Sequence, residues 1–151
     1  MNSYAEFFFT SIVDIFTNQG DDEYLGEPVT ISEHMLQAAH FAAEAGADVA
    51  VTDINLKDGR LQNVADEIEA MGRRSLAIQT DISKKSEVDS LVAEVVENLG
   101  GIDILMNVAV MYHRKSLTEL EEADWEELTN VNLKGYWLTH QAVAPIMKAQ
   151  R

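Results

Sequence analysis

Hydrophobic positions recur at two different spacings along the chain, and the change of spacing divides it into two parts. Up to about residue 46, the apolar side chains follow the three- and four-residue spacing of amphipathic helices. One helix is expected over residues 3–18. A second helix is expected to begin at Thr30, which stands at capping-box distance from Glu33, and to end near Gly46.

From Asp48 onward, short apolar runs alternate with longer helical patterns, which is the rhythm of parallel βα units. The runs that predict strands are residues 49–52, 75–79 and 102–106. The helices between these strands are expected to end at Gly72 and Gly100. A long helical pattern follows, in which Pro145 is expected to kink or end the helix.

The composition is that of one globular domain of ordinary size. The 151 residues are 46% hydrophobic and include no cysteine, and they contain neither an apolar run long enough to span a membrane nor a basic, apolar leader. With 26 acidic and 11 basic residues, the net charge of −15 opposes binding to nucleic acid or to an anionic membrane surface. We therefore expect a cytoplasmic protein whose partner is neither nucleic acid nor a membrane.

The charge is distributed unevenly along the chain. Residues 1–48 hold nine of the 26 acidic residues and none of the 11 basic ones. A break of this kind predicts two pieces of different origin, a helical segment over residues 1–48 and an α/β segment over residues 49–151.

A polar residue that can bind a ligand follows each predicted strand. Asp53 follows the first strand, Asp81 the second and Asn107 the third. Ligands of doubly wound sheets bind beyond the carboxyl ends of the strands. Asp53 can accept both hydroxyls of an adenosine ribose, and Asp81 can accept an adenine amino group, but each can equally cap a turn or helix. Asn107 can tie neighbouring strands together or touch a ribose.

The order and spacing of these residues resemble the short-chain dehydrogenase/reductase family over about residues 45–151. The motifs that carry the resemblance are AGADVAVTD (45–53), QTDIS (79–83), GIDILMNVAV (101–110) and NVNLKG (130–135). The resemblance implies an α/β fold with a partial, Rossmann-like doubly wound parallel sheet and NAD as cofactor. The residues that it assigns to the cofactor are Asp53, Asp81, Ile82, Asn107 and Ala109. It also implies that Asn132 is the Asn that supports the family's proton relay.

The chain departs from the family pattern in its phosphate-binding and proton-donating parts. No glycine lies between Gly26 and Gly46, where a Gly-rich turn would let backbone amides approach a pyrophosphate. Val108 and Val110 stand where the family has Asn and Gly. None of the four tyrosines has a lysine four residues later, so the family's Tyr-x-x-x-Lys pair is missing from these 151 residues. We therefore expect the adenosine half of an NAD site, with weak or lost NAD binding and no dehydrogenase turnover.

The absence of the family's first strand affects the predicted sheet, because that strand lies between the second and the fourth. We expect three parallel strands in the family order 3-2-4, with residues 49–52 between residues 75–79 and residues 102–106. The alternative is that residues 27–32 supply a substitute central strand. The capping box at Thr30 disfavours this alternative.

Residues 1–48 resemble the opening of HD-domain diiron oxygenases that act on organophosphonates. The residues that carry this resemblance are Tyr24, Gly26 and Glu27, followed by Glu33 and His34. The match implies that His34 is an iron ligand and that Tyr24 and Glu27 belong to a substrate-responsive lid. The other ligands of a diiron centre are absent from the sequence, so we expect no stable metal site.

Residues 44–48 read naturally in either family, so we interpret the sequence as two gene fragments joined there. The preferred hypothesis is that the protein binds a dinucleotide or an adenosine-like small molecule. The alternatives are a metal-binding helical protein built around His34, a homo-oligomer in which another chain supplies the missing parts, and a hybrid without function.

Overall fold

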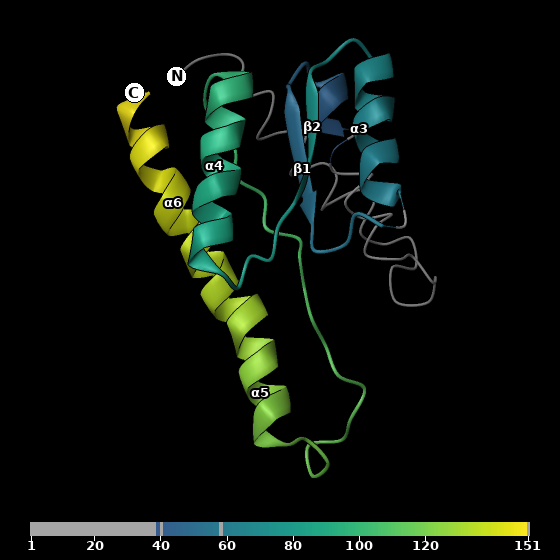
Figure 1. The fold of residues 1–151 in the computed structure, drawn as a ribbon, viewed down its shortest axis with the longest axis vertical. Helices are drawn as coiled ribbons and strands as arrows, with labels where there is room; N and C mark the ends of the chain where they lie inside the picture. Colours follow the sequence, from purple (N-terminus) through teal and green to yellow (C-terminus); the bar gives the residue numbers. More distant parts are fainter. Residues whose placement is uncertain (1–38, 40, 58, 151) are drawn as a thin grey trace, which may run out of the picture. The chain divides into compact units, whose positions relative to one another are not determined.

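The computed structural model describes residues 39, 41–57 and 59–150, all of which belong to the second of two compact units, Ile31–Arg151. Residues 39 and 41–44 are helical. The labelled elements that follow are β1 (Val49–Asp53), α3 (Arg60–Ala70), β2 (Ser75–Gln79), α4 (Lys85–Leu99), α5 (Glu122–Thr129), the π-helix η1 (Asn130–Gly135) and α6 (Tyr136–Ala149) (Figure 1). None of the described helices is long and apolar enough to cross a bilayer.

The sheet of the described residues has two parallel strands, which confirms the predicted α/β class. Strand β1 pairs with β2 in a register that places Val49 opposite Ser75 and Asp53 opposite Gln79. Helix α3 connects the strands and packs against both, as Figure 1 shows. The apolar cluster between helix and sheet includes Val51 and Ile68, both of which are buried. The two strands therefore end side by side at their carboxyl ends.

Two helix ends lie where glycine predicted them. Gly72 follows α3 with a φ of 81°, and Gly100 caps α4 with a φ of 95°. Both angles lie in the left-handed region, which glycine occupies without the steric cost of a Cβ atom. Leu61 and Ile68 of α3 and Val88 of α4 are buried.

The predicted third strand is wrong within the described part of the chain. Residues 102–106 form no ladder with β1, so the order 3-2-4 is not formed there. Instead, the side chain of Gln150 at the end of α6 forms hydrogen bonds with the backbone of Ile102. Its Oε1 accepts the Ile102 N–H at 3.0 Å, and its Nε2 donates to the Ile102 carbonyl at 3.1 Å. Ile104 and Met106 are 50% and 59% exposed, so burial does not hold this run in a strand register. The alternative strand over residues 27–32 lies outside the described residues, as does the helix predicted over residues 3–18.

The C-terminal helical pattern forms three consecutive helical elements. Of the two outcomes predicted for Pro145, an end of the helix is wrong, because α6 continues past it to Ala149, and a kink stays a prediction. The regular pattern is interrupted earlier, at η1, where the helix widens for six residues. A second apolar cluster forms where Ile82, Val88 and Leu138 are buried together. It joins α4 and the turn before it to α6, which packs against α4 (Figure 1).

Arg74 ties the amino ends of the strands to the end of α4. Its Nε donates to Oδ2 of Asp48 at 2.8 Å, and its two terminal nitrogens donate to the carbonyls of Asn98 and Leu99 at 2.8 and 3.0 Å. Hydrogen bonds from the backbone and side chain of Arg74 hold the pKa of Asp48 below its usual range. Asp48, at the predicted join of two fragments, is thus part of the α/β unit's own polar contacts.

Candidate functional site

Asp53 lies at the carboxyl end of β1, as predicted. Its Oδ1 accepts the backbone N–H of Asn55 at 2.8 Å, and its backbone carbonyl accepts the N–H of Thr80 at 2.9 Å. The second bond ties the ends of the two strands together. Among the described residues, no hydrogen bond reaches Oδ2, and the residue is half-buried. The described part of the chain therefore leaves the lone pairs of this one carboxylate oxygen available to a ligand.

Asp81 organises the turn between β2 and α4. Its Oδ1 accepts both the backbone N–H and the hydroxyl of Ser83, at 3.0 and 2.6 Å, and its Oδ2 lies 3.1 Å from Nζ of Lys84. Its own N–H donates to Oε2 of Glu87 at 2.7 Å. Burial raises the pKa of Asp81, but the hydrogen bonds from Ser83 and Lys84 outweigh it, so that this pKa lies below its usual range. The structure thus shows Asp81 in the turn-forming role that its sequence position allows.

Ile82 and Ala109 meet in the second apolar cluster. Ile82 is buried with Val88 and Leu138, and Ala109 packs against the same group. Two of the residues assigned to the cofactor by resemblance therefore belong to, or pack against, one apolar cluster.

Asn107 is tied to helix α6. Its Oδ1 accepts a hydrogen bond from the hydroxyl of Thr139 at 2.9 Å, and its Nδ2 lies 3.4 Å from Nδ1 of His140. The ribose contact proposed for Asn107 from sequence stays a prediction, and among the described residues the structure shows no tie from Asn107 to a strand. It shows a contact that holds the segment after residue 106 against a helix.

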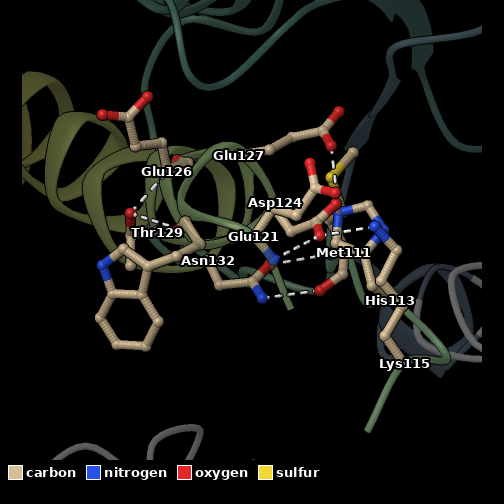
Figure 2. A network of polar contacts seen from close by, with 10 residues as sticks. Met111, His113, Lys115, Glu121, Asp124, Glu126, Glu127, Thr129 and Asn132 are labelled. Carbon is tan, nitrogen blue, oxygen red and sulfur yellow. Dashed lines mark hydrogen bonds and ion pairs between the residues drawn. The ribbon is translucent and has the colours of Figure 1, made fainter. Parts of the chain in front are cut away.

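Asn132 holds the backbone of Met111 at two points. Its Oδ1 accepts the Met111 N–H at 2.8 Å, and its Nδ2 donates to the Met111 carbonyl at 2.7 Å (Figure 2). The side chain therefore uses both of its polar atoms, as a neighbouring strand would use its backbone. Asn132 lies in η1, and π-turns of this kind mostly occur as short insertions in α-helices, frequently at functional sites.

A second set of polar contacts fastens the same segment to α5. Nζ of Lys115 lies 2.6 Å from Oδ2 of Asp124, and Nε2 of His113 lies 3.1 Å from Oε2 of Glu127 (Figure 2). Asp124 also accepts the N–H of Glu121, which caps the helix. The hydrogen bonds from Lys115 and from the Glu121 backbone lower the pKa of Asp124 below its usual range. Sequence reasoning missed these residues, although the basic run 113–115 beside the acidic run 119–127 was a signal for their attraction.

Thr80 carries an unusual polar atom at the carboxyl end of β2. The residue is 3% exposed, and its hydroxyl has no hydrogen-bond partner among the described residues. Sequence reasoning did not single it out, because a threonine at a strand end is common and its burial depends on the tertiary packing.

The candidate residues thus lie on two segments that pack against the same helical stretch. Residues 80–83 and 107–111 both contact the helical stretch 130–140, and Asp53 is joined to the first segment through Thr80. His34 lies outside the described residues, so both the iron-ligand role that the second resemblance implies for it and the expectation of no stable metal site stay predictions. No group of His, Cys, Asp and Glu side chains in the described part of the chain is arranged to hold a metal ion.

The family model for short chain dehydrogenases matches residues 36–151, which is more than half of the chain. The chain belongs to the short-chain dehydrogenase family. This membership confirms the family resemblance drawn from the motifs after residue 45, and the match begins ahead of the predicted join at residues 44–48.

Two curated relatives of this family member have names that state what they act on. It is 42% identical over 107 residues to the BbsD subunit of (2S)-[(R)-hydroxy(phenyl)methyl]succinyl-CoA dehydrogenase from Thauera aromatica, covering 71% of this chain and 42% of that protein. It is 38% identical over 109 residues to the 3-oxoacyl-[acyl-carrier-protein] reductase FabG of Staphylococcus epidermidis, covering 72% of this chain and 44% of that one. The chain therefore spans less than half the length of these relatives.

Solved structures of the family share the fold. A short chain dehydrogenase from Burkholderia cenocepacia, crystallised with NADP, is 36% identical, with a TM-score of 0.70 over 77% of this chain and 46% of that one. A short chain dehydrogenase/reductase from Burkholderia phymatum, crystallised with NAD, is 26% identical, with a TM-score of 0.70 over 79% of this chain and 41% of that one. These likenesses support the partial Rossmann-like fold and a nicotinamide dinucleotide as the family's cofactor.

Proposed function

We propose that this chain binds the adenosine half of NAD through Asp53 and Asp81. The observation that supports the proposal is the Asp53 carboxylate, which stands at the end of β1 with no hydrogen bond to Oδ2 among the described residues. A carboxylate at this place in a dinucleotide fold accepts the ribose hydroxyls. The N–H of Thr80, which donates to the Asp53 carbonyl at 2.9 Å, fixes the end of β1 relative to the turn that carries Asp81.

Asp81 is suited to accept the adenine amino group in addition to forming its turn. An ionised carboxylate has about four lone-pair sites, and the described residues donate to this one from Ser83 and Lys84. Its lowered pKa keeps it ionised, and hence an acceptor, at neutral pH. Asp53 thus serves as the acceptor for the ribose hydroxyls, and Asp81 as the acceptor for the adenine amino group.

The charge at Asp53 favours NAD over NADP. A 2′-phosphate placed against Asp53 would bring two like charges together at a site where the chain already carries a net charge of −15. Attraction to the ribose hydroxyls and repulsion of the phosphate act in the same direction.

We further propose that these 151 residues alone do not transfer hydride. When bound, the nicotinamide ring supplies the hydride acceptor, but a carbonyl or alcohol also needs a group that moves a proton. No tyrosine in the sequence has a lysine four residues on. Asn132, the catalytic Asn by family resemblance, uses both side-chain atoms to hold Met111. In this proposal, its side chain orients the segment that contains Met111.

Calorimetric titration with small nucleotides tests the binding site. We expect adenosine and 5′-AMP to bind, 2′-AMP to bind more weakly, and Asp53→Asn to raise the dissociation constant of adenosine about tenfold through loss of a charge-assisted acceptor. Asp66→Asn is the matched control, because Asp66 is exposed on α3 and bonds only its neighbour Gln62 among the described residues. Equal affinities for the wild type and Asp53→Asn would refute the assignment of Asp53.

A further inference from the structure

Gly135 lies at the point where the π-helix meets the turn that carries Asp81. It is buried, and a Cβ atom added to it would lie 2.8 Å from both Cγ1 and Cδ1 of Ile82 and 3.3 Å from the Ile82 carbonyl oxygen. Its φ of −57° is one that every residue adopts. Space, and not backbone conformation, therefore requires glycine here.

Ile82 links Gly135 to the turn that Asp81 and Ser83 form. It stands between Asp81 and Ser83, whose mutual hydrogen bonds form the turn. Its side chain is enclosed by Val88 and Leu138. Because packed interiors have little free volume, the depth to which Ile82 enters this cluster sets where the turn lies.

The same π-helix holds the second candidate segment three residues earlier. Asn132 binds the backbone of Met111, and Ala109 packs against the cluster that contains Ile82. One short helical element thus contacts residues 80–83 at Gly135 and residues 107–111 at Asn132 (Figure 2 shows the second contact). A shift of the helix at Gly135 moves both segments.

We propose that Gly135 is a positioning residue for the adenosine site. Because Gly135 has no side chain, Ile82 can pack closely against it, and this packing determines the position of the neighbouring Asp81. The proposal rests on the proposed function. A methyl group at position 135 has no flexible neighbour to displace, since Ile82 is buried, so the turn or the helix must move.

Four variants test this role, each measured in two ways. The variants are Gly135→Ala, Ile82→Ala, the double variant with both changes, and Gly101→Ala. The first readout is the dissociation constant of adenosine by calorimetry. The second needs no ligand: it is the hydrogen exchange of the amides of Ser83 and Met111, which bond Asp81 and Asn132. Gly101→Ala is the matched control, because its Cβ would also lie 2.8 Å from a neighbour, but that neighbour is the flexible end of Gln150.

We expect Gly135→Ala to weaken adenosine binding about tenfold and to speed the exchange of both amides. The double variant, in which Ile82→Ala removes the two clashing carbons, is expected to return both readouts to those of Ile82→Ala alone. Gly101→Ala is expected to match the wild type in affinity. A folded Gly135→Ala protein with wild-type affinity and exchange would overturn the proposal, as would a double variant whose affinity and exchange are worse than those of Ile82→Ala alone.

The two readouts separate this inference from the proposed function. A wild-type protein that gives no heat with adenosine would refute the proposed function, and the exchange of Ser83 and Met111 would then decide the role of Gly135 by itself. Where Gly135→Ala does not fold, the double variant decides: restored folding, with the amide exchange of Ile82→Ala alone, supports the proposal, and its failure overturns it.

Discussion

The side chain of Asn132 pairs with the backbone of Met111 as a strand would, accepting its N–H at 2.8 Å and donating to its carbonyl at 2.7 Å. The two residues are 21 positions apart. The contact replaces a ladder for a segment that has no neighbouring strand among the described residues. Asn132 makes this contact from the π-helix η1.

Replacing Asn132 with Ala is expected to lower the free energy of unfolding by about 1–3 kcal/mol, because a partly buried N–H and carbonyl both lose their partners. Chemical denaturation measures the change. Asn130→Ala is the control, since Asn130 is exposed in the same π-helix, and we expect a change within about 0.5 kcal/mol. Equal effects of the two substitutions would contradict the pairing.

Replacing Lys115 with Met is expected to raise the pKa of Asp124 toward its ordinary value, because the hydrogen bond from Lys115 is the largest cause of its lowering. Carbon NMR of the carboxyl group during an acid titration measures this pKa. A carboxyl whose pKa is lower in the folded than in the unfolded state stabilises the fold above its unfolded pKa, and this contribution is lost as the pH falls through the folded pKa. Lys115→Met should therefore lose less stability on acidification than the wild type.

Two further substitutions make the Asp124 titration specific. Lys115→Arg keeps the positive charge and should keep the pKa of Asp124 low. Lys85→Met removes a lysine that pairs with Asp89 instead, and it should leave Asp124 unchanged. A pKa of Asp124 that stays low in Lys115→Met would show that the ion pair does not control it.

Replacing Gln150 with Ala is expected to speed the hydrogen exchange of the Ile102 amide, because Gln150 Oε1 is the acceptor of that amide. The contact is exposed, so the free energy of unfolding should fall by no more than about 1 kcal/mol. The Thr80 amide, bonded to Asp53 within the sheet, should exchange as before. A slow Ile102 amide in this variant would indicate that residues 102–106 are paired as a strand after all.

The parts of the fold that local patterns determine were predictable. Strands β1 and β2 follow from apolar runs between helical patterns, and the ends of α3 and α4 follow from Gly72 and Gly100. The run at residues 102–106 has the same local pattern, yet a strand also needs a partner, and partner choice is a property of the tertiary structure. The local pattern alone could not reveal that the backbone of Ile102 forms hydrogen bonds with the Gln150 side chain instead.

The sequence predicted which residues lie at the candidate site, but not which contacts they make. Asp53 and Asp81 lie at strand ends because parallel strands place their following residues at one edge. The Asn132–Met111 pairing and the Gly135–Ile82 contact depend on how one helix packs against two distant segments. Neither leaves a periodic trace in the sequence, which is why sequence reasoning overlooked Gly135 and the contact with Met111; the catalytic role that the family resemblance implies for Asn132 stays a prediction.

The most direct test of the account compares NAD with adenosine in one calorimetric series on the wild-type protein, with NADH formation from added alcohols followed in the same samples. In the proposed site, the protein binds NAD through its adenosine half, and no Gly-rich turn between Gly26 and Gly46 contacts the pyrophosphate. The account therefore predicts that NAD binds within about tenfold of adenosine and that no NADH forms. NAD binding more than about a hundredfold tighter than adenosine, or steady formation of NADH, would contradict it.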